Sequence, residues 1–142
     1  MAARSKSGKM APKGHQQYYL IQFSYTSAAW DDLIKNPSKR DRVAAVKKIV
    51  YDLGGCIATI TFDCDEDPTP KEKFASFGDH DVVVLIAFPS DDAAAAFAMA
   101  ISAGGGVKSM KTTRIMPWKQ AMGSMGAAMA VQSGYAPPGK GR

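Results

Sequence analysis

Cysteine and histidine are scarce in this chain, whose 142 residues include two of each. The spacing of Cys56 and Cys64, with no histidine beside them, does not match a zinc site. If the residues between them form one extended strand, their Cα atoms lie roughly 26 Å apart at about 3.3 Å per residue, whereas a disulfide needs about 7 Å or less. We therefore expect no intrachain disulfide, no metal site and no cofactor, and we expect a reducing compartment.

Long apolar runs are missing as well. Apolar runs such as residues 82–88 are far shorter than the about 18 residues that indicate a membrane span. The first residues lack the apolar segment of a signal peptide. The length suits one domain with its own core and is short for two. We expect a cytoplasmic protein with no membrane span.

Acidic residues are absent from both ends of the chain. Residues 1–17 and residues 117–142 contain lysine and arginine but neither aspartate nor glutamate. The net charge of +5 therefore comes from the ends, and the middle of the chain is slightly acidic. Basic ends of this composition are typical of solvated tails, so we expect no nucleic-acid partner.

Hydrophobic patterning predicts the main elements. Branched and aromatic residues favour strands over residues 18–25, 56–62, 82–88 and 107–116. Capping residues and glycine or proline stops favour helices from Thr26 or Ser27 to Asn36, from Ser38 to Gly54, and from Ser90 to Gly104. Residues 63–73 are polar with two prolines and are expected to form a loop. The order β-α-β-β-α-β predicts an α+β, ferredoxin-like antiparallel sheet.

The pattern of the strand at residues 82–88 indicates whether the chain forms an oligomer. Both helices of this architecture cover one face of the sheet, so a strand with a bare second face should alternate apolar and polar residues. Residues 82–88 are apolar on both faces. We therefore expect a homo-oligomer, a dimer or larger, in which the sheet of a second subunit covers this face.

The last segment, residues 118–142, carries an apolar stripe. Trp118, Met122, Met125 and Met129 recur at helical spacing and predict an extra C-terminal helix. Methionine-rich stripes adapt to varied surfaces. The helix would lie on its own domain or on a neighbouring subunit, or it would bind a protein partner through these four residues.

Several motifs together resemble one family. They are the stretch from Tyr18 to Trp30, the Asn36-Pro37 stop, the Leu53-Gly54-Gly55 turn, Gly78-Asp79-His80-Asp81 before a valine-rich strand, and Phe97-Ala98-Met99-Ala100 before Gly104-Gly105. In this order, across residues 18–122, they resemble the GYD-domain family. The resemblance implies the fold of the dimeric α+β-barrel superfamily, with sheets paired between subunits. We accordingly expect a flexible basic leader at 1–17, a GYD-like ferredoxin-fold domain at 18–117, and a Met-rich helix and flexible tail at 118–142.

The sequence departs from the family at one place. His80 stands where the Gly-Tyr-Asp element that names the family has tyrosine, and the preceding connection, residues 63–77, is longer than is usual there. The resemblance implies no common activity, because the superfamily includes cofactor-free monooxygenases, lactone isomerases and haem enzymes, and fold alone does not fix function.

Two groups of residues could carry chemistry. His80 lies between Asp79 and Asp81, which could bind a ligand, and a nearby carboxylate can orient a histidine that acts as a general base. The alternative is an exposed histidine in a turn. Tyr25 and Trp30 lie at a predicted strand-to-helix junction, where they could orient a mostly apolar ligand or simply pack in the core.

Two classes of function remain open. The first is a non-catalytic binding or assembly module whose C-terminal helix engages a partner. The alternative is a cofactor-free enzyme or binder that takes a small hydrophobic or aromatic metabolite in a barrel pocket, with His80 transferring a proton. The sequence does not decide whether the chain is an enzyme.

Overall fold

The computed structural model of the chain describes residues 16–58, 64, 73–76 and 78–139, and the observations below concern these residues. The strands are β1 (Gln17–Tyr25), β2 (Cys56–Ile57), β3 (Lys73–Ala75), β4 (Val82–Phe88) and β5 (Val107–Ile115). The helices are α2 (Ser27–Lys35), α3 (Val43–Asp52), α4 (Asp91–Ala103) and α5 (Trp118–Val131), with short 3₁₀ turns η1 (Pro37–Lys39) and η3 (Gln132–Gly134).

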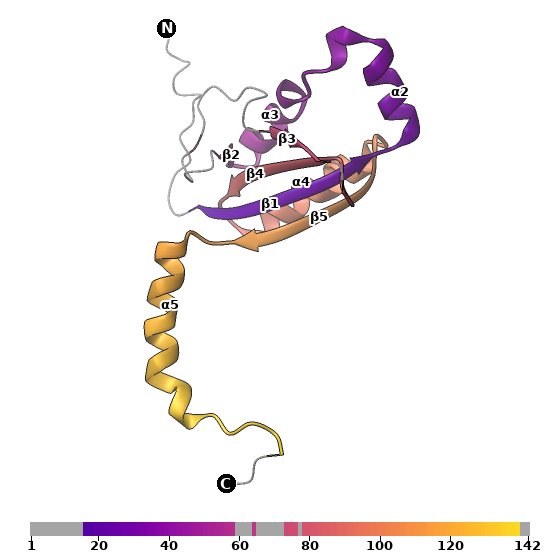
Figure 1. The fold of residues 1–142 in the computed structure, drawn as a ribbon. Helices are drawn as coiled ribbons and strands as arrows, with labels where there is room; N and C mark the ends of the chain where they lie inside the picture. Colours follow the sequence, from indigo (N-terminus) through magenta and orange to yellow (C-terminus); the bar gives the residue numbers. More distant parts are fainter. Residues whose placement is uncertain (1–15, 59–63, 65–72, 77, 140–142) are drawn as a thin grey trace, which may run out of the picture.

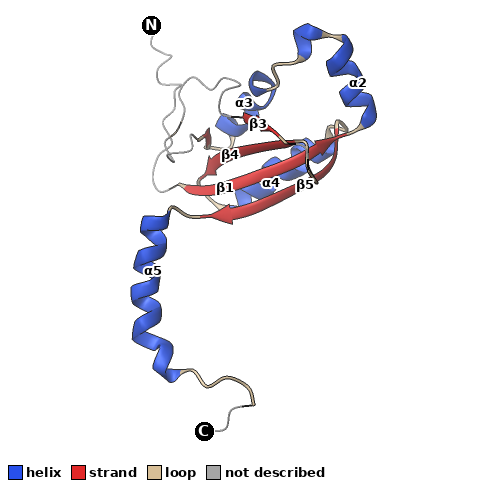
Figure 2. Ribbon diagram, viewed as in Figure 1, coloured by secondary structure: helices blue, strands red, loops and turns tan. Residues whose placement is uncertain are grey.

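One antiparallel sheet organises the domain. Its strands run in the order β2-β4-β1-β5, and β3 also pairs with β4. Helices α3 and α4 lie on one face of this sheet (Figure 1), and the other face carries no described helix (Figure 2). This arrangement confirms an α+β protein with an antiparallel sheet, consistent with the expected ferredoxin-like fold.

Alternation along the two central strands builds the core. Tyr19, Ile21 and Phe23 of β1 point to the face that α3 and α4 cover, and all three are buried. On the same face of β4, Val84 pairs with Ile21 and is also buried. Burial of these alternate side chains fixes the register, because a slip by one residue would turn every one of them to the opposite face.

Local signals set the ends of two helices as expected. The Thr26 hydroxyl accepts a hydrogen bond from the backbone N–H of Ala29 at 3.1 Å and caps α2. The Ser90 hydroxyl accepts from Ala93 at 3.2 Å and caps α4. The short helix before Pro37 and the alanine-rich helix after Pro89 were both predicted from these residues.

The start of α3 differs from the prediction. Ser38 lies in η1 and caps nothing, whereas α3 begins at Val43. The Asp41 carboxylate accepts a hydrogen bond from the Val43 backbone N–H at 3.1 Å, which provides the missing partner at the helix start. The predicted end is confirmed, since Gly54 follows the helix with φ of 83°.

The edge of the sheet beside β4 consists of two pieces. Ile57 pairs with Ile86, and the Ala58 N–H donates to the Leu85 carbonyl at 2.9 Å. The next β4 position, Val84, pairs with Lys73 of β3. The two pieces, one ending at Ala58 and the other beginning at Lys73, therefore pair with successive positions of β4. The predicted strand at 56–62 is found over Cys56–Ile57, and its residues 59–62 lie outside the described part. Of the predicted loop at 63–73, Cys64 and Lys73 are described, and Lys73 already belongs to β3; the rest lies outside the described part.

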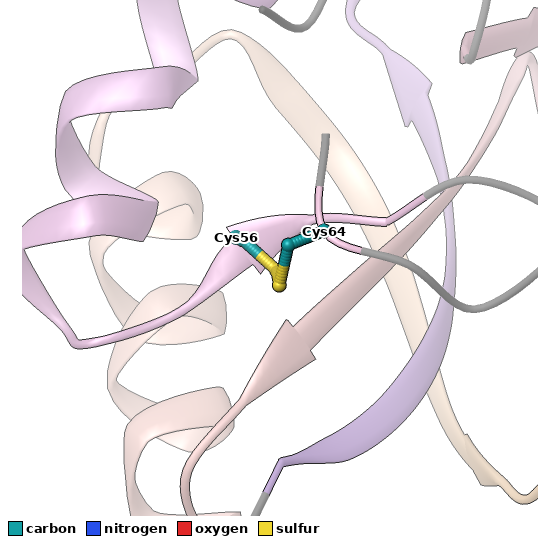
Figure 3. Close-up of a disulfide and its surroundings, with 2 residues drawn as sticks. All are labelled: Cys56 and Cys64. Carbon is teal, nitrogen blue, oxygen red and sulfur yellow. A yellow bond between two sulfur atoms is a disulfide. The ribbon is translucent and has the colours of Figure 1, made fainter. Parts of the chain in front are cut away.

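A disulfide joins Cys56 to Cys64, with Cα atoms 5.5 Å apart (Figure 3). The expectation that the two cysteines stay unpaired is wrong. It assumed one extended strand, but Ala58 and Cys64 form an antiparallel bridge, so the chain reverses direction between them. With the disulfide present, cysteine usage no longer supports a reducing compartment.

Helix α5 projects away from the sheet (Figure 1), and none of its residues is buried. The predicted C-terminal helix is confirmed, but it does not lie on its own domain. Its stripe is exposed, at 70% for Trp118, 56% for Met122, 50% for Met125 and 74% for Met129. Among the described helices, none has the length and apolar character needed to cross a membrane.

Candidate functional site

A cavity of about 360 Å³ lies between the sheet and the two helices that cover it. The sheet contributes Phe23, Val84 and Ile86, and the helices contribute Ile49 from α3 and Phe97 from α4. This volume falls in the range of sites that hold small molecules, about 300 to 1,000 Å³. All of its lining residues belong to one chain, and the cavity opens to solvent, since Ala45, Ala100 and Gly104 of its lining are exposed.

Small residues explain why the space stays open. Ala45 of α3 and Ala100 of α4 line the cavity, together with Gly104 and Gly106 after α4. None of these side chains is large enough to reach across to the opposite wall. The apolar faces of the two helices therefore meet the sheet with a gap between them, where a fully packed core would hold larger side chains.

Tyr25 and Arg42 meet at the rim of this cavity. The Arg42 side chain lies close enough to the Tyr25 phenol to influence its pKa. Burial raises the pKa of the Tyr25 phenol, while the nearby Arg42 guanidinium acts in the opposite direction. Tyr25 is therefore a neutral hydroxyl at neutral pH, and it stands beside a fixed positive charge.

Asp32 is the acidic residue of the lining, and its charge is already compensated. The Lys39 ammonium lies 3.1 Å and 3.0 Å from its two carboxylate oxygens. The Asn36 side-chain amide donates to the same carboxylate at 2.7 Å. The hydrogen bond from Lys39 lowers the pKa of Asp32, with smaller contributions from Asn36 and from the charge of Arg42. Asp32 thus stays ionised and paired.

Asp81 fixes the junction between β1 and α2. Its carboxylate oxygen Oδ2 accepts hydrogen bonds from the Tyr25 backbone N–H and the Trp30 indole N–H, each at 3.0 Å. The Asp81 backbone N–H donates to the Phe23 carbonyl at 2.9 Å. The rings of Tyr25 and Trp30 meet edge to face, with centroids 5.4 Å apart. Asp81 therefore positions Tyr25, while Trp30 packs behind Tyr25 and does not line the cavity.

The structure does not place His80 with these groups. The His80 carbonyl accepts a hydrogen bond from the Ser76 hydroxyl, and the Asp79 carbonyl accepts one from the Ser24 hydroxyl at 3.4 Å. Neither His80 nor Asp79 lines the cavity. Of the sequence-predicted ligand residues, Tyr25, Trp30 and Asp81 come together, and Tyr25 alone reaches the cavity. A catalytic role for His80 stays a prediction.

Sequence reasoning missed Arg42. The signal that could have found it is the start of α3 at Val43. With that start, Arg42 directly precedes a helix with an apolar face, close to the end of the strand that carries Tyr25. The predicted start at Ser38 made Arg42 one more polar residue inside a helix. The four-residue stripe of α5, Trp118, Met122, Met125 and Met129, is not part of the cavity lining.

Comparison with known proteins identifies part of the chain. A family model described as the GYD domain matches residues 69–125, which include β3, β4, α4 and β5. No curated protein and no solved structure matched the chain in the same comparisons. The match begins after Cys64 and takes in Gly78-Asp79-His80-Asp81, one of the motifs in the resemblance. The resemblance predicted from the sequence is confirmed over residues 69–125, where the chain matches the GYD-domain model.

Proposed function

We propose that this chain is a non-catalytic binding module that holds a small, mostly apolar molecule in the cavity between the sheet and helices α3 and α4. The observation that carries the proposal is the cavity itself, about 360 Å³ in volume and lined chiefly by apolar side chains. Apolar walls with a few polar groups at one place are typical of ligand sites.

The polar groups at the rim favour binding over proton transfer. Burial raises the pKa of the Tyr25 phenol, so it holds its proton at neutral pH. The Arg42 guanidinium stays protonated in proteins, and Asp32 is paired with Lys39. None of the three is suited to act as a base there. The alternative, a cofactor-free enzyme acting on a hydrophobic or aromatic metabolite, would need His80 to reach the ligand from outside the lining.

Titration with phenylnaphthylamine, an uncharged probe whose fluorescence rises in apolar surroundings, tests the proposal. We expect saturable binding at one site per chain. Ala100→Phe places a ring in the cavity lining and should weaken binding about ten-fold or more, a loss of ~1.4 kcal/mol. Ala95→Phe adds the same ring to an exposed position of α4 that does not line the cavity, and should change affinity less than about two-fold.

Circular dichroism would confirm that both variants keep their helices. Absence of saturable binding to the wild-type protein would overturn the proposal. So would equal affinities for Ala100→Phe and Ala95→Phe.

The second face of the sheet supports the proposal that the module works as a homo-oligomer. Leu20 of β1 pairs with Leu85 of β4 on this face, and Val83 lies beside them; all three are half-buried. Phe74 of β3 pairs with Val83 and is 49% exposed. No described helix covers these side chains (Figure 2). A second copy of the sheet would remove this apolar surface from water.

Native mass spectrometry of Leu85→Glu tests the assembly. A buried carboxylate at the centre of the proposed contact should convert the oligomer to a monomer, since unpaired buried charge is costly. Ser102→Glu introduces the same charge at an exposed position of α4 and should leave the subunit number unchanged. The proposed homo-oligomer would be overturned if the wild-type protein is a monomer, or if Leu85→Glu forms an oligomer of wild-type size.

The exposed stripe of α5 supports a partner-binding role for Trp118, Met122, Met125 and Met129. The helix has no buried residue, so these side chains are open to a neighbouring subunit or to another protein. Deletion of residues 118–142 distinguishes the two. A smaller oligomer after deletion would assign the stripe to the neighbouring subunit, and an unchanged oligomer that loses a co-purifying protein would assign it to that protein. If the deletion changes neither the size of the oligomer nor the co-purifying protein, the partner-binding role is overturned.

A further inference from the structure

We infer that the molecule held in the cavity is a small organic acid, an apolar body with one carboxylate that Arg42 binds at the rim. The inference rests on the proposed function, and it adds a chemical class to the ligand. Among the described residues that line the cavity, Arg42 is the one cationic side chain.

The positive charge of Arg42 is available to a ligand. Among the described residues, no carboxylate forms a salt bridge with it, and it lies near the neutral Tyr25 phenol. The Arg42 side chain is exposed, so its guanidinium is open to an anion that arrives at the rim. A carboxylate there could form charge-assisted hydrogen bonds with it.

The nearby acids each have another partner. Asp32 is paired with Lys39 and also accepts from Asn36. The Asp41 carboxylate accepts from the Val43 backbone N–H, and Asp31 is paired with Lys35 at 3.0 Å. Lys39, which lies outside the lining, pairs with Asp32, the one carboxylate among the lining residues, so Arg42 is the lining charge that is left without an ion pair. An anionic group can therefore pair with Arg42, and a cationic one would be repelled by it.

Two donors can meet one carboxylate at this place. The planar guanidinium of Arg42 offers parallel N–H groups that match two carboxylate oxygens. The neutral Tyr25 hydroxyl can turn its proton toward an anion. The remainder of the ligand would lie against Phe23, Ile86 and Phe97 inside the cavity. The arrangement fits an amphipathic acid with a hydrophobic or aromatic body.

A matched pair of probes tests the charge. Anilinonaphthalene sulfonate carries an anion, and phenylnaphthylamine is the same skeleton without it. Arg42→Met should weaken the sulfonate by about ten- to a hundred-fold, the range for hydrogen bonds to a charged group, and weaken the neutral probe less than about two-fold. Lys48→Met removes a cation from α3 outside the cavity lining and should change neither affinity.

Competition then separates carboxylates from anions in general. Naphthoate should displace the sulfonate probe from the wild-type protein, and naphthamide, which has the same shape without the charge, should do so at least about ten-fold more weakly. Equal displacement by the two would overturn the carboxylate assignment. In Arg42→Met the advantage of naphthoate should disappear, and persistence of that advantage would show that another group binds the anion.

The outcomes distinguish this inference from the function on which it rests. If both probes bind and Arg42→Met changes the affinity of neither, the cavity is a ligand site, but the inference that its ligand is an organic acid bound by Arg42 is wrong. If neither probe binds the wild-type protein, the proposed function fails and the inference fails with it. Arg42→Lys keeps the charge but loses the two-point contact, so it should bind the sulfonate with intermediate affinity; affinity equal to Arg42→Met would contradict a charge-based contact.

Discussion

The Asp81 carboxylate accepts hydrogen bonds from the Trp30 indole and from the Tyr25 backbone through the same oxygen, each at 3.0 Å. One acidic side chain thus connects the turn before β4 to the junction between β1 and α2. Because Tyr25 lines the cavity, Asp81 acts on the site through the placement of Tyr25.

Asp81→Ala should lower the free energy of unfolding by about 1 to 3 kcal/mol, since it leaves the Tyr25 backbone N–H without its partner. In a Trp118→Phe background, Trp30 is the remaining tryptophan, and its emission should shift to the red as the indole loses its contact. Urea denaturation followed by fluorescence measures both. Asp79→Ala removes an exposed carboxylate with no side-chain bond among the described contacts and should change stability by less than about 0.5 kcal/mol. Equal effects of the two variants would contradict the assignment.

The Cys56–Cys64 disulfide should stabilise the sheet edge. It closes a short loop, with a sequence separation of 8, and the chain-entropy relation gives about 2 to 3 kcal/mol for a loop of this size. We expect reduction by dithiothreitol to lower the free energy of unfolding by that amount. The double variant Cys56→Ala, Cys64→Ala should be insensitive to the reductant. A wild-type unfolding midpoint that is the same with and without dithiothreitol would show that the bond is not formed.

Stability should fall at high pH because of Tyr19. Burial, then the hydrogen bond to Asp91 at 2.6 Å and its negative charge, raise the pKa of Tyr19 to about 12. The unfolded phenol loses its proton near pH 10, so between about pH 10 and 12 the unfolded state binds fewer protons than the folded state. Stability contributed by Tyr19 is complete below pH 10 and is lost as pH rises through that window. Tyr19→Phe should lose stability less steeply there; parallel profiles would contradict the shift.

Gly55 should not tolerate a side chain. A Cβ there would collide with the Ala87 carbonyl oxygen and come within 2.8 Å of the Phe88 ring. Both neighbours are fully buried, so they have little room to yield. Gly55→Ala should cost about 1 to 3 kcal/mol of unfolding free energy. Gly78 has open space around it, so Gly78→Ala serves as the control and should cost less than about 0.5 kcal/mol. Thermal denaturation compares them.

Local patterns predicted the parts of the fold that depend on neighbours in sequence. Residues 82–88 are a strand because a run of branched residues between turn residues has one stable conformation in a core, and the hydroxyl of Ser90 caps α4 within one turn. The start of α3 was predicted less well, since Ser38 and Asp41 are both good capping residues. In the structure Arg42 is the N-cap residue, and Asp41, just after the 3₁₀ turn that follows Pro37, accepts the hydrogen bond from the Val43 N–H.

Contacts between distant segments could not be predicted. The reversal that brings Cys64 beside Ala58 leaves no periodicity in the sequence, so an extended strand was the simpler assumption. The cavity too depends on contacts between segments that are distant in the sequence. Tyr25 was expected at a pocket mouth from its place at a strand end, but its partner Arg42 comes from a separate segment. Only the packing of α3 against the sheet brings the two together.

Methyl resonances of the labelled protein during titration with phenylnaphthylamine test the central claim most directly. Ile49, Ile86 and Ile101 line the cavity, whereas Leu20 and Leu85 lie on the opposite face of the sheet. We predict saturable shifts in the three isoleucine methyls and none in the two leucines. Shifts in Leu20 and Leu85, with the isoleucine methyls unchanged, would place the ligand on the outer face and contradict the account.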